Sequence, residues 1–458
     1  MKKIDFLQLF SGYDVRGVYN EDLDERVAQV TGSAFAEFLS KKGVEGTVFV
    51  GADNRASSPA LKDAAVLGLQ SKNLKLVDLG EVTTGLFHFA LSSKNAVGGL
   101  MVTASHNPPE YNGFKLYDKN LPLSRVQMDQ VRYLAQNSLF EKRELEEVEK
   151  LDLSQEYVQD VAGKNPLKRG LKVVLDAANG NAGLFAPSIF RKMGCDVVEL
   201  YCTPDSSFPN HPADPSKEEN VEDLKKKVLE EKADLGIAFD GDGDRTAFVD
   251  EQGRFVRADD ANIIFARDAL SKSRNAAVVY DLRLSLAFKE EVERLGGSAV
   301  MTKSGRIAVR SELLKNNAVF GGETSGHFYF KENYGYDDAI YSGAKMTSII
   351  SRGEPLSRLT DDLPHYPATV ELRPFCQNNK KRQVVQALQT FLSEKFEIST
   401  LDGVRVELEG GWGLVRVSNT QPALSVRAEA KTRESLEKIY GILKNLLGVH
   451  DVQLPELK

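Results

Sequence analysis

The sequence predicts an α/β protein in which one strand-and-helix unit occurs three times before a smaller last domain. A β-rich run that ends in a polar turn starts each copy: "GTVFVGADNR" (46–55), "LKVVLDAANG" (171–180) and "NAAVVYDLRLS" (275–285). A helical stretch and a second short strand follow, and a third apolar run then enters a polar loop, "VTASHNP", "FDGDGDR" or "GGETSGH". Strands that alternate with helices indicate a substantially parallel sheet, whose ligands are bound by loops at the carboxyl ends of the strands.

Shifts in composition divide the chain into four predicted domains. The charged connector "EKRELEEVEKLD" (141–152) is expected to form a solvated helix that leads out of the first unit. Ser216, with Glu219 three residues later, predicts a capping box at the start of a helix. The stretch "LPHYPATVELRP" (363–374), with three prolines, is interpreted as the link to the last domain. The predicted domains are residues 1–150, 151–252, 253–363 and 364–458.

The overall composition argues against several classes of partner. A net charge of −7 disfavours nucleic acid, because a phosphate backbone requires a basic surface. No window approaches the roughly 18 consecutive apolar residues of a membrane span. The three cysteines, Cys195, Cys202 and Cys376, form no CxxC pair, so neither zinc nor disulfides are implied. We therefore expect a cytoplasmic protein without a membrane or nucleic-acid partner and without an obligate protein partner.

The stretch "LGIAFDGDGDRTAFVDEQG" (235–253) is the strongest candidate for a metal site. An apolar run leads into three aspartates that alternate with glycines: Asp240, Asp242 and Asp244. Carboxylate oxygens suit Mg²⁺ or Ca²⁺ and disfavour zinc. Without a cation, three such carboxylates would repel one another. We favour a magnesium site with Arg245 beside it to hold a phosphate oxygen.

Two other interpretations of this stretch stay open at this point. An EF-hand loop would need glycine where Arg245 stands, and a helix where the strand "TAFVD" follows. A phosphatase of the haloacid-dehalogenase type would use Asp240 as phosphoryl acceptor, with Asp337 and Asp338 as acidic partners.

The remaining polar loops carry a candidate nucleophile and candidate ligands for a phosphorylated sugar. In "TASHNPPEYNGFK" (103–115), Ser105 lies on a turn after a strand, and a serine beside a magnesium triad can carry a phosphoryl group. In "GGETSGH", the oxygens of Glu323 and Ser325 suit sugar hydroxyls, and His327 is a possible proton carrier. In "RVSNTQPALSVR" (416–427), arginine, hydroxyl and amide groups around one turn suit a phosphate group.

Together these four loops resemble the α-D-phosphohexomutase superfamily, specifically its bacterial phosphomannomutase/phosphoglucomutase branch. The resemblance extends from "YDVRG" (13–17) to "SNTQPALSVR" (418–427), and the four motifs occur in the family's order at domain-sized intervals. It implies three similar mixed-sheet α/β domains and a smaller C-terminal α+β domain like the TATA-box-binding protein, arranged around a central cleft. It also implies a Mg²⁺-dependent transfer of phosphate between the 1- and 6-positions of a hexose, with a hexose 1,6-bisphosphate as intermediate and activator.

The resemblance implies a role for each candidate residue. Ser105 would carry the phosphoryl group and help to bind Mg²⁺ together with the three aspartates. Arg16, His106, Lys115, Arg245 and His327 would lie in the catalytic centre, with Lys115 a candidate proton donor and His327 a candidate base. The substrate, a small phosphosugar, would be bound by Tyr13, Arg283, Arg306, Glu323, Ser325, His327, Arg416, Ser418, Asn419, Thr420 and Arg427.

Two departures from the family pattern bear on the sugar. Arg283 stands where this branch usually carries lysine, and Arg306 where it usually carries histidine. Both keep the positive charge but change its reach and donor geometry. Mannose and glucose are the expected sugars. The alternatives are a phosphoglucosamine mutase, a phosphatase that forms an aspartyl phosphate, and a non-catalytic sugar-phosphate binding module.

Overall fold

The protein divides into two compact units. The structure, a computed structural model, describes residues 4–10, 12–43, 46–138, 144–408, 410–418 and 421–457. Unit 1 comprises Met1–Ala258 with Ser325–Asp361, and unit 2 comprises Asp259–Thr324 with Asp362–Lys458. Among these described residues, no helix combines the length and the hydropathy that a membrane span requires.

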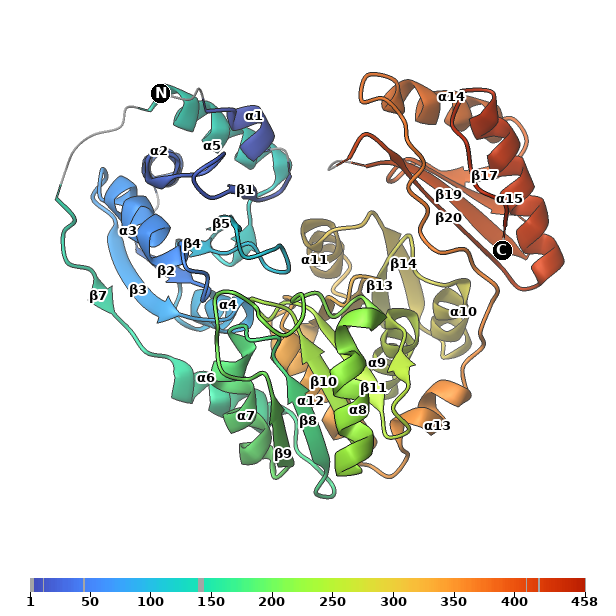
Figure 1. The fold of residues 1–458 in the computed structure, drawn as a ribbon, viewed down its shortest axis with the longest axis horizontal. Coiled ribbons are helices and arrows are strands. Elements are labelled where there is room, and N and C mark those ends of the chain that lie inside the picture. Colours follow the sequence, from blue (N-terminus) through green and yellow to red (C-terminus); the bar gives the residue numbers. More distant parts are fainter. Residues whose placement is uncertain are drawn as a thin grey trace. The chain divides into compact units, whose positions relative to one another are not determined.

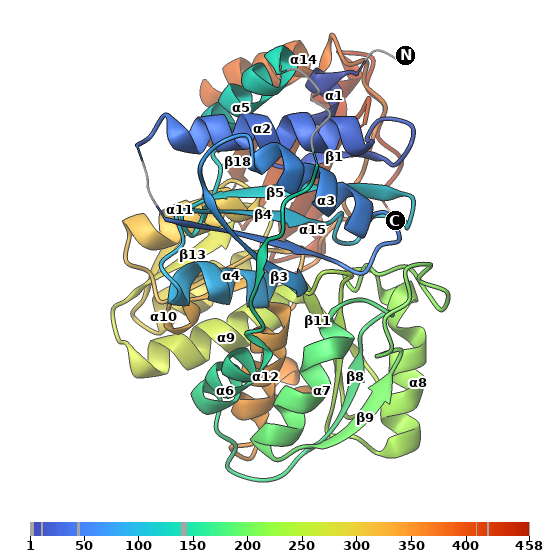
Figure 2. The same cartoon turned by 90° about the vertical axis from the view of Figure 1, so that its left-hand side faces the viewer.

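Unit 1 begins with a mixed sheet in the strand order β1-β5-β4-β2-β3-β7, with β6 paired to β5. Its strands are β1 (Val15–Val18), β2 (Thr47–Ala52), β3 (Lys75–Glu81), β4 (Gly98–Val102), β5 (Tyr111–Asp118), β6 (Leu121–Pro122) and β7 (Glu149–Lys150). Its helices are α1 (Phe6–Leu9), α2 (Glu25–Ser40), α3 (Ser58–Leu69), α4 (Thr84–Ser93) and α5 (Arg125–Asn137). A Cβ at Gly98 would meet Leu39 of α2, whereas one at Gly99 would meet Leu91 of α4. Because consecutive strand residues face opposite sides, α2 and α4 cover opposite faces of this sheet (Figure 2).

A second mixed sheet of unit 1 has the order β12-β11-β10-β8-β9 (Figure 1). Its strands are β8 (Lys172–Asp176), β9 (Asp196–Leu200), β10 (Leu235–Phe239), β11 (Thr246–Asp250) and β12 (Phe255–Val256). Around it lie α6 (Ser154–Lys164), α7 (Ala182–Met193), η1 (Glu218–Val221), α8 (Glu222–Glu231), β16 (Phe328–Phe330), η2 (Lys331–Asn333), α12 (Ala339–Ile350) and α13 (Leu356–Asp361). Gly236 of β10 faces Val228 of α8, and the next residue, Ile237, faces Gly343 of α12. Helices therefore cover both faces of this sheet as well.

Unit 2 repeats the same strand order. Its strands β13 (Ala277–Asp281), β14 (Ser298–Thr302) and β15 (Phe320–Gly322) are parallel, with β13 in the middle. The helices are α9 (Ala258–Lys272), α10 (Leu286–Arg294) and α11 (Arg306–Lys315). The order β14-β13-β15 matches β3-β2-β4 and β9-β8-β10 in unit 1. In each copy the first strand lies between the second and the third, which confirms the predicted threefold repeat.

The last domain is a smaller antiparallel sheet with helices on one face. Strands β17 (Glu397–Ser399), β18 (Val404–Leu408), β19 (Gly411–Val417) and β20 (Leu424–Ala430) pair in sequence order, and α14 (Lys381–Ser393) and α15 (Arg433–Gly448) pack against them. Gly413 of β19 faces Leu443 of α15. On the opposite face, Trp412 and Leu414 form a buried cluster with Leu282 of the preceding α/β domain. The predicted smaller α+β domain is therefore confirmed, and within unit 2 it is joined to its neighbour by a buried contact.

Two local predictions were wrong. Residues 144–148 of the charged connector have no helix and lead into the short strand β7, while residues 141–143 lie outside the described ranges. The predicted capping box at Ser216 is absent, because the Ser216 hydroxyl donates to Asp214 Oδ1 at 2.6 Å and α8 begins only at Glu222. Residues 144–148 lack the apolar face by which a helix would pack against the protein. At Ser216, the hydrogen bond to Asp214 takes the place of the predicted cap.

Candidate active site

Ser105 lies on the loop that follows β4 and is buried, with 3% of its surface exposed. Its φ of 51° places it in the left-handed region, where a non-glycine residue is uncommon. The backbone N–H of Ser105 donates to Thr103 Oγ1 at 2.9 Å, which supports this conformation. The hydroxyl donates to Asp240 Oδ2 at 2.7 Å and lies 3.3 Å from Nδ1 of His106. The predicted nucleophile and the first predicted metal ligand are therefore in direct contact.

Arg55, which sequence reasoning missed, holds the serine loop in place. Its side chain is buried and paired with Asp53, with 3.0 Å between Arg55 Nε and Asp53 Oδ2. The two terminal nitrogens donate at 2.6–3.0 Å to four backbone carbonyl groups, those of Ser105, Asn107 and Pro108 in the loop and of Tyr111 at the start of β5. The sequence shows only that Asp53 and Arg55 stand at the end of a predicted strand. It does not show that Arg55 donates to backbone carbonyl oxygens of another segment.

The three aspartates form a compact, buried cluster after β10. One ligand atom of each lies within 4.8 Å of the others. Asp240 Oδ1 accepts from the backbone N–H groups of Asp244 and Arg245, at 2.9 and 3.1 Å. Gly243 has a φ of 70°, and a Cβ at Gly241 would come within 2.6 Å of the Ser105 carbonyl oxygen. The two glycines therefore permit the tight turn and the close approach of the serine loop.

The donor set of this cluster fits a divalent cation. Burial, and then the charges of Asp244 and Asp242, raise the pKa of Asp240 well above its usual range. Lys115 offsets part of the charge, because its Nζ donates to Asp242 Oδ2 and Asp244 Oδ2, each at 2.6 Å. Oδ1 of Asp242 is nevertheless buried without a hydrogen-bond partner among the described residues. Carboxylate oxygens that converge in this way are suited to Mg²⁺.

A histidine and an arginine lie beside the cluster. His327 Nε2 lies 3.3 Å from Asp244 Oδ1 and accepts from Arg245 Nε at 3.4 Å. His327 Nδ1 lies 2.8 Å from Ser325 Oγ. Burial, and then the positive charges of Arg245 and Arg16, lower the pKa of His106 to about 2. His106 is therefore a neutral imidazole at physiological pH.

The N-terminal motif contributes to the same region of unit 1. Arg16 in β1 donates from Nη1 to Asn107 Oδ1 at 2.7 Å, and its other terminal nitrogen lies 3.4 Å from Asp14. Tyr13 is half-buried three residues before it. The structure thus connects Ser105, His106, Lys115, Arg245, His327 and the three aspartates through direct contacts, and Arg16 through Asn107.

Unit 2 contains most of the residues predicted to bind the substrate. Asp281 accepts from Nε and Nη2 of Arg283, at 3.0 and 2.5 Å. Glu323 is buried and accepts from the backbone N–H of Gly305 at 2.9 Å, next to Arg306 at the first position of α11.

The last domain supplies the phosphate-loop residues of unit 2. Arg416 Nη1 lies 3.1 Å from Asp402 Oδ2, and Arg427 Nη2 lies 3.5 Å from Asp259 Oδ2. Ser418 is buried, and its hydroxyl oxygen accepts from the backbone N–H of Gln421. The predicted residues Asn419 and Thr420 lie outside the described residues.

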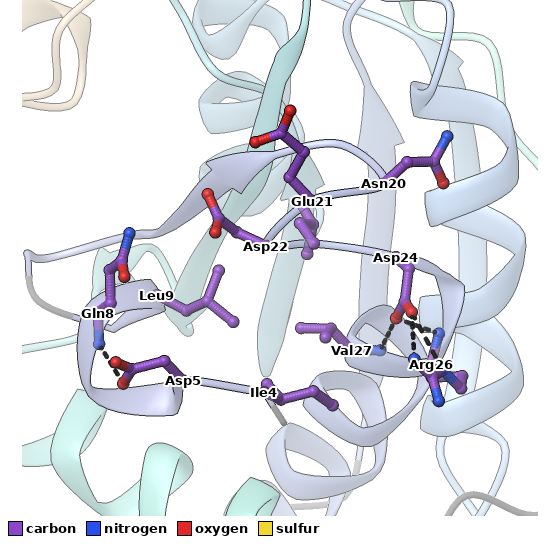
Figure 3. Close-up of a pocket in the computed structure, with 11 residues that line it drawn as sticks. Ile4, Asp5, Gln8, Leu9, Asn20, Glu21, Asp22, Asp24, Arg26 and Val27 are labelled. Carbon is purple, nitrogen blue, oxygen red and sulfur yellow. Dashed lines mark hydrogen bonds and ion pairs between the residues drawn. The ribbon is translucent and has the colours of Figure 1, made fainter. Parts of the chain in front are cut away.

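A pocket of about 200 Å³ in the first domain is separate from these residues (Figure 3). Two of its acidic side chains have structural roles. Asp5 accepts from two backbone N–H groups as the cap of α1, while Asp24 caps α2 and pairs with Arg26 at 2.8 Å. None of the predicted site residues lines this pocket.

Comparison with protein-family models gives four consecutive matches. They are described as phosphoglucomutase/phosphomannomutase, alpha/beta/alpha domain I (residues 7–142), domain II (155–253), domain III (257–366) and the C-terminal domain (372–441).

Proteins similar to this chain cover nearly its whole length. A phosphomannomutase/phosphoglucomutase of Pseudomonas aeruginosa is 37% identical over 98% of this chain and 97% of its own length. A phosphoglucomutase of Neisseria gonorrhoeae is 34% identical over 96% of each chain. A crystal structure of a phosphoglucomutase/phosphomannomutase family protein from Burkholderia thailandensis has a TM-score of 0.90 and 34% identity, over 99% of this chain and 100% of that one. A protein of Methanopyrus kandleri named "Probable phosphoglucosamine mutase" is 35% identical over 94% of this chain and 95% of its own length.

Proposed function

The chain belongs to the phosphoglucomutase/phosphomannomutase family, and we propose that it interconverts hexose 1-phosphates and hexose 6-phosphates, with mannose and glucose as the sugars. The observation that carries this proposal is the contact between Ser105 Oγ and Asp240 within a buried triad of aspartates. A serine that lies against a cation site can accept and donate a phosphoryl group, because the transfer depends mainly on positioning and charge neutralisation. The substrate is thus a small phosphosugar.

Asp240, Asp242, Asp244 and the oxygen of Ser105 would hold Mg²⁺. When bound, the ion would neutralise negative charge on the transferring phosphoryl group. The unpartnered Oδ1 atom of Asp242 supports this assignment, and so do the burial and the neighbouring carboxylates that raise the pKa of Asp240. Lys115 supplies a positive charge on the side of the cluster that faces β5.

Ser105 would carry the phosphoryl group between turnovers. The Ser105 Oγ–P bond breaks as the sugar hydroxyl oxygen forms a bond to phosphorus, which gives the hexose 1,6-bisphosphate. The sugar then reorients, and its other phosphoryl group returns to Ser105 Oγ, leaving the isomeric monophosphate. Burial of Ser105 supports this scheme, because it limits hydrolysis of the phosphoserine by water.

His327 is the residue that we assign as general base. With Nδ1–H donating to Ser325 Oγ, Nε2 carries the lone pair, and the sugar hydroxyl would replace Arg245 Nε as the donor to that nitrogen. Lys115 is assigned as the acid, because its ammonium group lies within the cluster and carries a proton that it can give to the substrate oxygen. His106 and Arg16 would hold the serine loop and the transferring phosphate. Arg245 contacts Nε2 of His327, whereas Ser325 contacts Nδ1.

The remaining assignments concern the substrate. We assign the sugar hydroxyls to Glu323 and Ser325, and the choice of sugar to Arg283, Arg306 and Tyr13. The non-transferring phosphate would be bound by Arg416, Ser418, Asn419, Thr420 and Arg427. We also propose a cytoplasmic location, because the three cysteines are free thiols, which fits a reducing compartment.

A panel of mannose, glucose and glucosamine 1-phosphates tests this function, each with Mg²⁺ and the matching 1,6-bisphosphate. We expect turnover of mannose and glucose 1-phosphates. Turnover of glucosamine 1-phosphate alone would identify a phosphoglucosamine mutase, and release of inorganic phosphate in place of isomerisation would identify a phosphatase. Binding without turnover of any of the three would contradict the enzymatic assignment.

A further inference from the structure

Arg416, which the proposed function assigns to the non-transferring phosphate, already contacts two carboxylates of its own chain. Its Nη1 lies 3.1 Å from Asp402 Oδ2, and its Nη2 lies 3.5 Å from Glu371 Oε1. Its Nε donates to Ser425 Oγ at 3.3 Å, and the Ser425 hydroxyl in turn donates to Glu371 Oε1. All three nitrogens of this guanidinium are therefore engaged within unit 2.

Glu371 joins three arginines through one half-buried carboxylate. Oε1 lies 3.0 Å from Arg373 Nη2 and 3.5 Å from Arg416 Nη2, while Oε2 lies 3.9 Å from Arg283 Nη1. The segment that carries Glu371 is fixed by a bridge between Leu372 and Val426 of β20. Glu371 thus contacts both Arg283, assigned to the sugar, and Arg416, assigned to the phosphate.

A carboxylate and a phosphate use the same donors of an arginine. Both accept paired N–H groups of a guanidinium, so an anion that approaches Arg416 meets a site where Glu371 already accepts. The nearby negative charge also lowers the affinity of Arg416 for a second anion. The proposed reaction requires release of the bisphosphate from its binding groups when it reorients. An alternative acceptor on the same arginine would favour that release.

We propose that Glu371 is a positioning residue that competes with the phosphate of the sugar for Arg416, so that the bisphosphate is released for reorientation. The inference rests on the proposed function. A competing role and a purely structural role of Glu371 predict opposite changes in substrate affinity when the residue is replaced. Loss of a competitor strengthens substrate binding, whereas loss of a structural support for Arg416 weakens it.

The test is Glu371→Gln, which removes the charge and keeps the size of the side chain. Steady-state kinetics with glucose 1-phosphate are expected to show KM and kcat both lowered about 2- to 5-fold, the size of a typical partly exposed charge interaction. In a Ser105→Ala background, where no transfer occurs, calorimetry with glucose 1-phosphate should show a dissociation constant lowered by a similar factor. Glu371→Asp, which keeps the charge at a greater distance, should give a KM between those of the native protein and Glu371→Gln.

Two control variants separate this effect from a general one. Glu407→Gln, on the neighbouring strand β18 and paired with Arg405, should leave KM unchanged. In an Arg416→Gln background, Glu371→Gln should no longer tighten binding, because the arginine for which both anions compete is absent. A KM that is unchanged or higher in Glu371→Gln would overturn the inference. Failure of the native protein to turn over any hexose phosphate would instead contradict the proposed function.

Discussion

The hydroxyl of Ser105 donates a hydrogen bond to Asp240 Oδ2 across 2.7 Å, although the two residues lie 135 positions apart in the chain. Ser105 follows β4 of the first sheet, and Asp240 follows β10 of the second. Other hydrogen bonds join the loops of the two sheets: the N–H of Thr84, at the start of α4, donates to the carbonyl of Asp242 at 2.8 Å. The side chain of Asn181 accepts from the N–H of Asn54, also at 2.8 Å. The candidate nucleophile and its metal ligand therefore depend on the packing of two sheets within unit 1.

Mg²⁺ is expected to stabilise the folded protein. A cation that binds the folded aspartate cluster and not the unfolded chain raises the thermal midpoint by mass action. Asp242→Asn removes one ligand charge and should weaken the apparent Mg²⁺ affinity at least about tenfold. The measurement is the thermal midpoint of metal-free protein over a Mg²⁺ titration. Asp223→Asn, on the exposed side of α8, serves as control, and an equal response of both variants would contradict the assignment of the triad.

Replacement of Arg55 should both destabilise unit 1 and slow the reaction. Arg55→Met leaves Asp53 and four backbone carbonyl groups without their shared partner, and breaking a buried pair in this way costs about 3–5 kcal/mol. Because the same arginine fixes the Ser105 loop, kcat should fall more than KM rises. Denaturant unfolding and steady-state kinetics check both effects. Arg191→Met, at an exposed pair with Glu199, should change stability by less than about 1 kcal/mol.

The stability of unit 1 should depend on pH through Asp338. Burial raises the pKa of Asp338 to about 6, above the usual 3.8 of an aspartate side chain. Between these values the folded state binds more protons than the unfolded state, so stability falls as pH rises through this range. Relative to Asp338→Asn, the native protein should lose on the order of 3 kcal/mol between pH 4 and pH 7. Parallel urea unfolding of the two proteins at several pH values measures this, and a difference that does not vary with pH would contradict it.

The sequence was most informative where a motif combines residue type with a position at a strand end. The three polar loops and the threefold repeat were predicted because parallel strands bring their carboxyl ends to one edge. The EF-hand alternative fails for the reason given by the sequence, since the strand β11 follows the aspartates and no helix does.

Other parts of the site could not be predicted, because the groups that they contact form no recognisable pattern in the sequence. Arg55 donates to backbone carbonyl groups, which every residue offers. Glu371 lies in a stretch interpreted as a linker, and its arginine partners come from three separate segments. Ser216 has the composition of a helix cap, but its hydroxyl bonds to Asp214 and the helix begins later.

Arg283 should influence the choice of sugar more than the transfer itself. Arg283→Lys restores the residue usual in this branch but loses the two-nitrogen contact with Asp281. We expect the ratio of kcat/KM for mannose and glucose 1-phosphates to change by about tenfold, equivalent to about 1.4 kcal/mol. Phosphorylation of Ser105 by a hexose 1,6-bisphosphate should stay within about twofold of the native rate. A ratio that is unaltered would remove Arg283 from the specificity residues.

The most direct test of the central claim is to locate the phosphoryl group on the protein. Dephosphorylated protein is incubated with glucose 1,6-bisphosphate and Mg²⁺, treated with or without hydroxylamine, and its peptides are analysed by mass spectrometry. The proposed mechanism predicts one phosphoryl group on Ser105 that survives hydroxylamine, and its loss together with all mutase activity in Ser105→Ala. A hydroxylamine-labile group on Asp240, or full activity of Ser105→Ala, would contradict it.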